Sequence, residues 1–392
     1  MSSSPLRVLH SLGQSVWFDY IHRSDLTSGR VKDLIDVDGI TGITSNPSIF
    51  EKAISSSTEY DDSIRKLAKA GNNAPLIFES LEVEDIRMAA DIFRPVYDST
   101  NGGDGFVSIE VAPTLARDTR GTVTEARRLW RKVDRPNVLV KVPGTAEGLP
   151  AIERLLSEGI NINITLLFVI ERYEQVALAY LAALEKLAHQ GKPLEGVASV
   201  ASFFVSRIDG VADRQLEAKL SAAKSAEERH RLQWLLGKTA IANAKLAYQK
   251  FKEIFSGPRF QPLAQRGGRV QRMLWASTST KNPQYSDTLY IDALIGPGTI
   301  NTMPVASLEA YRDHGNPALR VEDGLDEART VLRQLAEEGL DLPAMTAELE
   351  QHGVGLFTKD YEKLLATLAE KRRRYAATPP VQPAAMGRRR AS

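Results

Sequence analysis

The stretch Asn137-Val-Leu-Val-Lys-Val-Pro-Gly144 combines the composition of a buried β-strand with a single lysine, Lys141. Successive side chains of a strand point to opposite faces, so its three valines share one face while Leu139 and Lys141 share the other. Lysine is rarely buried, because its ammonium group loses its hydration. A lysine in a dry interior titrates lower, and its neutral amine is the nucleophile of Schiff-base chemistry. The alternative is an edge-strand lysine whose ammonium group reaches water.

Short strand-like runs recur on both sides of this stretch, and longer amphipathic segments separate them. About eight strands alternating with helices predict an α/β fold, a single closed (β/α)8 TIM barrel. A doubly wound open sheet is the alternative, but its glycine-rich turn should open a helix, whereas Gly102-Gly-Asp-Gly105 precedes a strand and indicates a loop. The expected strands are Val16–Ile21, Gly39–Thr44, Phe106–Val111, Val138–Val142, Ile160–Leu166, Val197–Phe204, Met273–Ser277 and Leu289–Ile295, and the expected helical stretches include Glu82–Tyr97, Thr122–Val133, Val169–Ala188 and Ala226–Phe255.

The domain organisation follows from composition. Residues 1–375 are expected to form the barrel, and the helical pattern from Asp209 to about Gly257 elaborates it. From about Lys371 the chain becomes basic and then proline-rich, so residues 376–392 are expected to be a disordered tail. Such a basic tail could contact nucleic acid, but a solvated chain end is the more frequent case.

Composition excludes several classes of function. Of 392 residues, 43% are hydrophobic and 25% charged, and 50 basic residues balance 49 acidic ones, which favours neither nucleic acid nor a membrane surface as partner. The chain has no cysteine, and its six histidines have no metal-ligand spacing, so we expect no metal. The N-terminal sequence lacks an apolar signal region and no later stretch approaches a membrane span, so we expect a cytoplasmic protein. A homo-oligomer remains open.

Polar side chains share one face of four predicted strands. Parallel strands covered by helices are normally apolar on both faces, and the outer face of a barrel packs on helices. These polar groups should therefore point into the barrel mouth, where barrel enzymes place their chemistry. The set comprises Asp19, Ser108, Glu110, Lys141, Asn161, Asn163 and Thr165.

Four of these residues also have a structural alternative. Asp19 could cap a helix near Ser24, and Glu110 could be a surface ion-pair partner. Asn163 and Thr165 could be hydrogen-bonding residues at the end of a strand. An amine, two carboxylates, a hydroxyl and amides at one strand depth suit carbinolamine formation and carbon–carbon cleavage, which need repeated proton transfers.

Two cations are candidates for phosphate binding. Arg207 follows a strand and lies near a helix start, while Lys281 lies beyond the strand that ends in Trp275-Ala-Ser-Thr278. Barrels often bind phosphate near their last strands, although either cation could be a solvated loop residue. Gly296-Pro-Gly298 could form an anion-binding nest but is better interpreted as an ordinary turn.

The stretch Ile40-Thr-Gly-Ile-Thr-Ser-Asn-Pro-Ser-Ile-Phe50 resembles the N-terminal signature of the transaldolases. The resemblance covers about Leu6 to Tyr375 and is closest to the longer bacterial members. It implies an eight-stranded barrel and no cofactor. The other segments that resemble the family are Val138–Thr145, Asn161–Phe168, Val200–Asp209 and Trp275–Asp292, the last of which contains Tyr285-Ser-Asp-Thr-Leu-Tyr290.

The resemblance also implies roles for the polar residues of the mouth. Lys141 is implied to be the Schiff-base lysine, and Glu110 an acid/base group that works through a water held by Thr165. Asp19 is implied to move the proton of the donor C4 hydroxyl. The residues implied to bind substrate are Asn46, Asn163, Ser202, Phe204, Arg207 and Ser277. Where many members carry a second phosphate arginine, two residues past this serine, the chain has Ser279, and the nearest cation is Lys281.

The implied activity is transfer of a dihydroxyacetone unit between sugar phosphates through a lysine Schiff base, in the non-oxidative pentose phosphate pathway. The donor would be sedoheptulose 7-phosphate or fructose 6-phosphate, and the acceptor glyceraldehyde 3-phosphate or erythrose 4-phosphate. One alternative is an aldolase that releases dihydroxyacetone. In the small aldolases related to this family, however, the Glu110 position resembles a glutamine and the Phe204 position a tyrosine. A second alternative is a sugar-phosphate-binding or regulatory protein without catalytic activity. The loss of the lysine or of a carboxylate would favour it, and the chain retains them all. A metal-dependent aldolase is disfavoured because no histidine lies at the inner strand positions.

Overall fold

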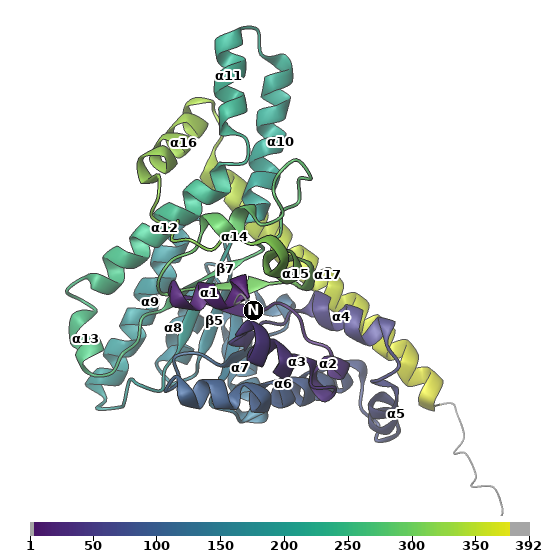
Figure 1. Ribbon diagram of the computed structural model, residues 1–392. Coiled ribbons are helices and arrows are strands. Elements are labelled where there is room, and N and C mark those ends of the chain that lie inside the picture. Colours follow the sequence, from purple (N-terminus) through teal and green to yellow (C-terminus); the bar gives the residue numbers. More distant parts are fainter. Residues whose placement is uncertain (1–3, 377–392) are drawn as a thin grey trace, which may run out of the picture.

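The computed structural model describes residues 4–376, and its centre is a closed barrel of eight parallel strands paired in chain order (Figure 1). The barrel closes where β8 pairs with β1, with Gln14 opposite Thr299 and Phe18 opposite Met303. The closed barrel confirms the predicted fold class. The strands are β1 (Gln14–Phe18), β2 (Gly42–Ile43), β3 (Phe106–Glu110), β4 (Val138–Pro143), β5 (Ile162–Leu167), β6 (Ser199–Phe204), β7 (Arg272–Ala276) and β8 (Thr299–Met303).

Helices surround this barrel and fill the connections between its strands. In the first half of the chain they are α1 (Pro5–Ser11), α2 (Arg23–Thr27), α3 (Arg30–Asp33), the π-helical turn η1 (Leu34–Asp38), α4 (Pro47–Ser56), α5 (Asp61–Lys69), α6 (Ala74–Ser99), the 3-10 turn η2 (Pro113–Leu115), α7 (Thr119–Val133), α8 (Gly148–Leu156) and α9 (Ile170–His189). In the second half they are α10 (Ser206–Ala222), α11 (Ala226–Leu235), α12 (Thr239–Ser256), α13 (Gln261–Gln265), α14 (Leu289–Ala293), α15 (Val305–His314), α16 (Leu325–Glu337) and α17 (Leu342–Ala376).

The short strand β2 depends on a glycine. A Cβ atom at Gly42 would lie 2.6 Å from the ring of Trp17, so no other residue lets β2 approach β1 this closely. The fully buried Trp17 donates its indole N–H to Asp104 Oδ1 at 2.8 Å. Asp104 belongs to the Gly102–Gly105 stretch, which forms the loop before β3, as expected.

One predicted strand is wrong. Leu289–Ile295 is not a strand, because Leu289–Ala293 form the short helix α14, which buries Tyr290 and Ile291. The eighth strand is instead β8, whose sequence Thr-Ile-Asn-Thr-Met has no continuous hydrophobic run. The apolar spacing of a short helix and that of a buried strand are hard to tell apart, and here the hydrophobic stretch belongs to the helix. Gly296-Pro-Gly298 forms the turn that leads into β8.

The helical elaboration rises from one end of the barrel. Helices α10 and α11 project as a pair, and α16 lies beside them (Figure 1). A second apolar cluster, with Leu216, Leu232, Leu235 and Val331 among its members, joins α10, α11, α12 and α16. The expected helical stretch Ala226–Phe255 is two helices, since the chain turns at Gly237 in the left-handed region, with φ of 69°.

The long helix α17 crosses the molecule from α10 towards α4 and α5 (Figure 1). The basic stretch that starts at Lys371 is helical as far as Ala376, so the change in composition does not end the ordered chain. Lys371 Nζ donates to the carbonyl of Ile54 at 3.1 Å and to Asp61 at 2.9 Å. The rest of the predicted tail, residues 377–392, lies outside the described residues.

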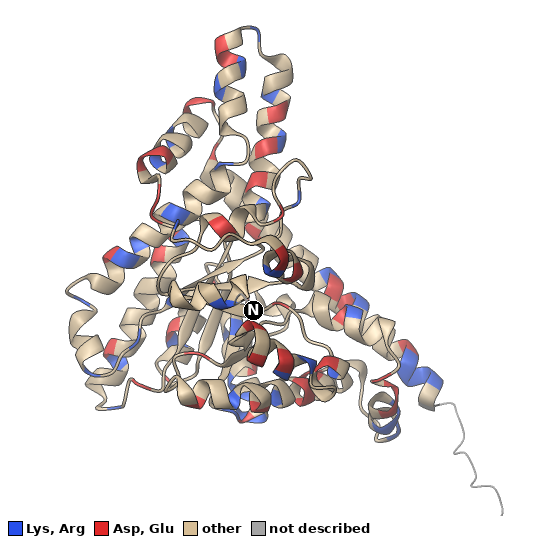
Figure 2. Cartoon of the chain, in the orientation of Figure 1, with Lys and Arg blue, Asp and Glu red and all other residues tan. Residues whose placement is uncertain are grey.

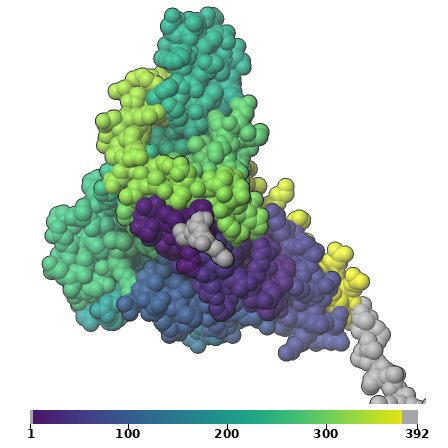
Figure 3. All heavy atoms as spheres, viewed as in Figure 1, coloured from purple at the N-terminus to yellow at the C-terminus, as the bar shows by residue number. Residues whose placement is uncertain are grey.

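The surface mixes charges of both signs, and Figure 2 shows acidic and basic residues interspersed over the helices. In Figure 3 the purple N-terminal residues, including α1, lie against the green segment around α15, which follows β8. Helix α1 also contacts β1, and α15 contacts β8, the two strands whose pairing closes the barrel. Within residues 4–376, every helix is too short or too polar to serve as a membrane span.

Candidate active site

Lys141 lies inside the barrel mouth and is paired with Glu110. Its Nζ donates to Glu110 Oε2 at 3.0 Å and to the carbonyl of Ser45 at 2.9 Å. The two residues are direct neighbours in the register of β3 and β4, and their exposed fractions are 5% and 6%. Burial makes this ion pair costly unless its remaining groups are also hydrogen-bonded. The lysine is therefore not the edge-strand residue of the structural alternative, and Glu110 is not a surface ion-pair partner.

Asp19 directly follows β1 and faces the same cavity as Lys141. Its Oδ1 accepts a hydrogen bond from Thr44 Oγ1 at 2.7 Å, and Thr44 Oγ1 lies 2.6 Å from Thr302 Oγ1. Burial raises the pKa of Asp19 above its ordinary value, while the hydrogen bond from Thr44 and the charges of Lys141 and Arg207 lower it. Asp19 is not a helix cap, since the cap of α2 is His22.

Two buried side-chain oxygens, one on Glu110 and one on Thr165, are left without partners among the described residues. Burial raises the pKa of Glu110 while the Lys141 ammonium lowers it, and the second carboxylate oxygen, Oε1, makes no hydrogen bond. Thr165 Oγ1 is likewise buried and unpaired. The pairing of β5 with β6 shifts between Ile164 and Leu167, and Leu166 has a φ of 61°, which is unusual for a residue other than glycine. This irregularity lies next to Thr165, as bulges near active sites often do.

A row of hydrogen bonds, centred on Asn163 opposite Lys141 in the register of β4 and β5, forms a floor inside the barrel. Asn163 Nδ2 donates to Ser108 Oγ at 3.0 Å, and Ser202 Oγ donates to Asn163 Oδ1 at 2.6 Å. Both ends of the Asn163 amide are thus used inside the barrel, and this residue is fully buried. The contacts of Asn163 position its neighbours from below.

The cavity above this floor measures about 490 Å³. The sequence-predicted residues that line it are Asp19, Asn46, Lys141, Thr165, Ser202, Phe204, Arg207, Ser277 and Lys281. Asn163 does not line it, and Glu110 lines a neighbouring cavity of about 450 Å³ while it reaches the first through Lys141. The lining residues that the sequence did not single out include Tyr20, Thr44, Ser48, Lys52, Thr302 and Phe357.

These omissions have physical reasons. Phe357 comes from α17, more than two hundred residues after Lys141, and no local pattern marks a helix that packs over the mouth. Lys52 lies on the exposed face of α4, where a lysine is ordinary. Thr44 and Ser48 flank Asn46 in the stretch that resembles the transaldolase signature, so that stretch carried a usable signal for them.

Asn46 combines a structural contact with a place in the cavity wall. Its Oδ1 accepts a hydrogen bond from the backbone N–H of Ile49 at 3.0 Å, which caps the N-terminus of α4. The cap uses the oxygen alone, so the amide Nδ2 keeps both of its hydrogen-bond donors.

The far end of the cavity is positively charged. The Arg207 guanidinium lies 5.2 Å from the centre of the Phe204 ring, and no carboxylate of residues 4–376 forms an ion pair with it. Lys281 stands at the rim and donates to Ser279 Oγ at 2.6 Å. Desolvation and the positive charge of Arg207 lower the pKa of Lys281. Two neighbouring cations that form no ion pair with a carboxylate of the described residues suit a bound anion.

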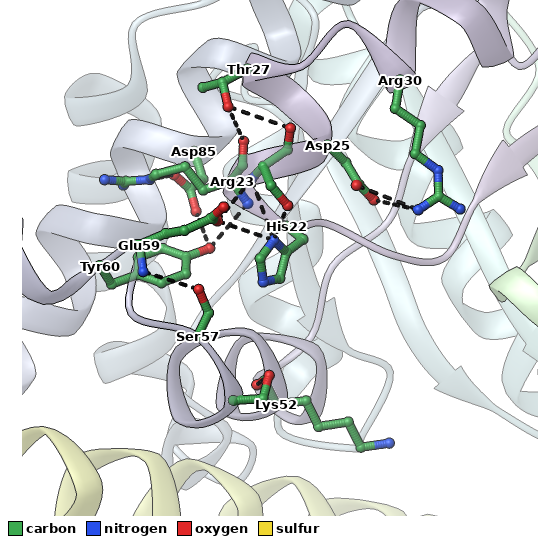
Figure 4. A network of polar contacts seen from close by, with 12 residues as sticks. His22, Arg23, Asp25, Thr27, Arg30, Lys52, Ser57, Glu59, Tyr60 and Asp85 are labelled. Carbon is green, nitrogen blue, oxygen red and sulfur yellow. Dashed lines mark hydrogen bonds and ion pairs between the residues drawn. The ribbon is translucent and has the colours of Figure 1, made fainter.

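A buried network anchors the chain just after Asp19 (Figure 4). Arg23 Nε donates to Asp85 Oδ1 at 2.8 Å, and the Tyr60 hydroxyl donates to Asp85 Oδ2 at 2.8 Å. Burial raises the pKa of Asp85 to about 6, although the Arg23 guanidinium opposes this. The network ties α2 to α5 and α6 and so fixes the segment that carries Asp19 and Tyr20. In the described part of the chain, no cluster of histidine and carboxylate side chains is arranged to hold a metal ion.

Comparison with known proteins agrees with this geometry. The model of the transaldolase/fructose-6-phosphate aldolase family matches residues 16–368. A protein named transaldolase 2 from a Nostoc species is 46% identical over 374 residues, which cover 95% of this chain and 98% of that protein. Transaldolases of Saccharopolyspora erythraea and Thiobacillus denitrificans are 46% and 47% identical and cover 94% and 91% of this chain, and 98% and 97% of their own. With matches of this identity over nearly its whole length, the chain belongs to the transaldolase/fructose-6-phosphate aldolase family.

Proposed function

We propose that this chain is a transaldolase that moves a dihydroxyacetone unit from a ketose phosphate to an aldose phosphate through a Schiff base on Lys141. The observation that carries the proposal is that Lys141, buried and paired with Glu110, lines a cavity that also holds the cations Arg207 and Lys281. The donor would be sedoheptulose 7-phosphate or fructose 6-phosphate, and the acceptor glyceraldehyde 3-phosphate or erythrose 4-phosphate.

The first step forms the covalent bond. Transfer of one proton from the Lys141 ammonium to Glu110, 3.0 Å away, gives the neutral amine. The amine attacks the C2 carbonyl of the ketose, and the new hydroxyl at C2 leaves as water after Glu110 returns its proton. The unpaired Glu110 Oε1 and Thr165 Oγ1 are the two groups free to bind the water that would carry this proton. The iminium then bears the charge that the ammonium bore at the start.

The second step cleaves the C3–C4 bond of the ketose. The iminium accepts the electron pair of the C3–C4 bond once the C4 hydroxyl gives its proton to Asp19, which the hydrogen bond from Thr44 helps to keep ionised. An aldose phosphate leaves, and the dihydroxyacetone unit stays on Lys141 as an enamine. When the acceptor enters, its aldehyde carbon bonds to the enamine, and Asp19 returns the proton to the new hydroxyl.

Asn46, Ser202 and Phe204 line the cavity between the two ends and are proposed to hold the hydroxyls and the carbon chain of the sugar. Asn163 acts beneath them, since its hydrogen bonds to Ser108 and Ser202 fix the floor. At the cationic end, Arg207, Lys281 and Ser277 are proposed to bind the phosphate. A lysine offers a point charge where arginine offers a planar fork, so Arg207 is the main ligand.

An aldolase that releases free dihydroxyacetone is the second candidate. It shares every step up to the enamine and then protonates the enamine carbon and hydrolyses the resulting iminium, which releases dihydroxyacetone and free Lys141. Glu110 and Phe204 favour the transferase, because the small aldolases related to this family differ at both positions. The same resemblance supports a place in the non-oxidative pentose phosphate pathway. Since charged sugar phosphates do not cross membranes freely, we also propose a cytoplasmic enzyme. We propose that it binds neither membrane nor nucleic acid, because its 50 basic residues are balanced by 49 acidic ones.

Borohydride reduction with fructose 6-phosphate, followed by peptide mass mapping, tests the proposal. A three-carbon adduct on Lys141 is expected, and an intact protein with no adduct on any lysine would contradict the Schiff base. Erythrose 4-phosphate is then added before reduction. Loss of the adduct with formation of sedoheptulose 7-phosphate supports the transferase, whereas release of dihydroxyacetone at the same rate with and without acceptor would establish the aldolase.

A further inference from the structure

Two buried aspartates outside the reacting groups share one face of α10. Asp209 and Asp213 lie one helical turn apart and are 2% and 7% exposed. The Tyr290 hydroxyl donates to Asp209 Oδ2 at 2.9 Å, and the Tyr285 hydroxyl donates to Asp213 Oδ2 at 2.8 Å. The other oxygen of each carboxylate accepts a backbone N–H near the start of α12. The donor to Asp209 is Ala240, at 2.7 Å, and the donor to Asp213 is Gly237, at 3.0 Å.

Both tyrosines belong to the segment between β7 and β8 that also carries Lys281. Hydrogen bonds within this segment hold it together. Thr280 Oγ1 donates to the carbonyl of Ser286 at 2.8 Å, and the N–H of Tyr285 donates to the carbonyl of Asn282 at 3.1 Å. A shift of Tyr285 would therefore move Lys281 with it. Tyr285 also packs on Gly237, where a Cβ atom would lie 2.8 Å from its ring.

Arg207, the other cation of this end of the cavity, lies on α10, the helix that carries the two aspartates. Arg207 is the second residue of α10, two positions before Asp209. The N–H of Ser206 donates to the carbonyl of Ser277 at 3.0 Å, and the hydroxyls of these two serines lie 3.1 Å apart. Two sets of contacts thus join α10 to the segment after β7. One is between Ser206 and Ser277, and the other is between the two aspartates and the two tyrosines.

The two carboxylates are poorly explained as devices for stability alone. Within the described residues neither forms an ion pair with a basic side chain, and each accepts only neutral donors. Burial and the nearby charge of Asp213 raise the pKa of Asp209 to about 7. Buried carboxylates without a cation usually cost stability compared with apolar residues of similar size. Their value is then in the geometry that they impose.

We infer that Asp209 and Asp213 are positioning residues for phosphate recognition, which hold Lys281 opposite Arg207 through Tyr290 and Tyr285. The inference rests on the proposed phosphate role of the two cations and goes beyond it by assigning what keeps them together. It also gives a role to the stretch Tyr285-Ser-Asp-Thr-Leu-Tyr290, which none of the reaction steps uses. The ligand class is a phosphate monoester, whose two negative charges need both cations at a fixed separation.

The test compares acceptors with and without phosphate. With sedoheptulose 7-phosphate as donor, KM and kcat are measured for glyceraldehyde 3-phosphate, which yields fructose 6-phosphate, and for glyceraldehyde, which yields fructose. For Tyr285→Phe, the KM for the phosphorylated acceptor should rise roughly three- to tenfold with kcat nearly unchanged, while the values for glyceraldehyde stay within error. Tyr180→Phe is the matched control, because its hydroxyl donates to the carbonyl of Arg269 at 2.8 Å, away from the cavity.

Asp213→Asn is a second variant, since it keeps the size of the side chain and one oxygen acceptor. Lys281→Ala separates this inference from the proposed phosphate role. If Lys281→Ala lowers the preference for the phosphorylated acceptor but the folded Tyr285→Phe and Asp213→Asn proteins do not, the positioning role is wrong and the phosphate role stands. If none of the three lowers it, the phosphate role of Lys281 fails as well. An equal loss in Tyr180→Phe would indicate a general structural effect and would also overturn the inference.

Discussion

The end of the cavity at Lys141, where we propose the reaction (the reacting end), and the end at Arg207 and Lys281, where we propose phosphate binding (the phosphate end), are built from different kinds of structure. Lys141 and Glu110 lie on strands, fixed by register and by an ion pair of 3.0 Å. Arg207 and Lys281 lie on the first turn of a helix and on a connecting segment, and their separation depends on hydrogen bonds from elsewhere. Chemistry that needs reacting atoms held within fractions of an ångström is placed on the rigid scaffold, whereas recognition of a charged group is placed on the loops.

The comparison predicts that changes at the reacting end act on kcat and changes at the phosphate end act on KM. The largest effect is expected for Lys141→Ala, which removes the nucleophile and should lower kcat by about 10⁴-fold or more. Glu110 would lose its counter-charge but can take up a proton, since burial already raises its pKa. Circular dichroism should therefore show a folded barrel. Turnover well above background in the folded variant would contradict the role of Lys141.

A smaller loss is expected for Asp19→Asn, because the amide cannot accept the C4 proton while Thr44 can still donate to it. Cleavage should slow by about 10²- to 10⁴-fold, as is typical when a general base is removed. Imine formation does not use Asp19 in the proposed scheme, so borohydride should still trap an adduct on Lys141. A variant that is folded but cannot be trapped would contradict this division of roles.

At the phosphate end, Arg207→Ala should lower the affinity for phosphorylated substrates. Loss of a charge-assisted contact should raise KM for phosphorylated substrates about 10- to 100-fold while kcat changes far less. Measurement of inhibition by inorganic phosphate, which lacks the sugar, checks that the lost affinity belongs to the anion. Equal losses for phosphorylated and unphosphorylated acceptors would place Arg207 with the reacting groups and remove the contrast between the two ends.

The same contrast explains how much of the molecule the sequence could predict. On strands, the alternation of side chains identified Lys141 and Glu110 as inward-facing residues, and their pairing across β3 and β4 follows from that geometry. The eighth strand was missed because Thr299–Met303 has no hydrophobic run, while the apolar stretch before it folds as α14. Phe357 and Lys52 reach the cavity through packing between distant segments, which no local pattern records.

The smallest expected effect concerns the acid side of the pH profile. As a base, Asp19 must be ionised, so kcat should fall as the pH drops through its pKa, which burial raises above the ordinary value for aspartate. The hydrogen bond from Thr44 stabilises the carboxylate and lowers this pKa. Thr44→Val should therefore move the acid limb to higher pH, by about one unit or less, with little change in the plateau.

Thr302→Val is the matched control for this prediction. It removes a hydroxyl 2.6 Å from Thr44 Oγ1 but leaves the hydrogen bond from Thr44 to Asp19 in place, so its acid limb should move less. An acid limb that stays where it is in Thr44→Val would mean that the limb reports another group, with Glu110 the first to test. A change in plateau kcat without a shift in the limb would instead assign Thr44 to the positioning of Asp19. Either result would weaken the claim that electrostatics at the reacting end is set by contacts between strand ends.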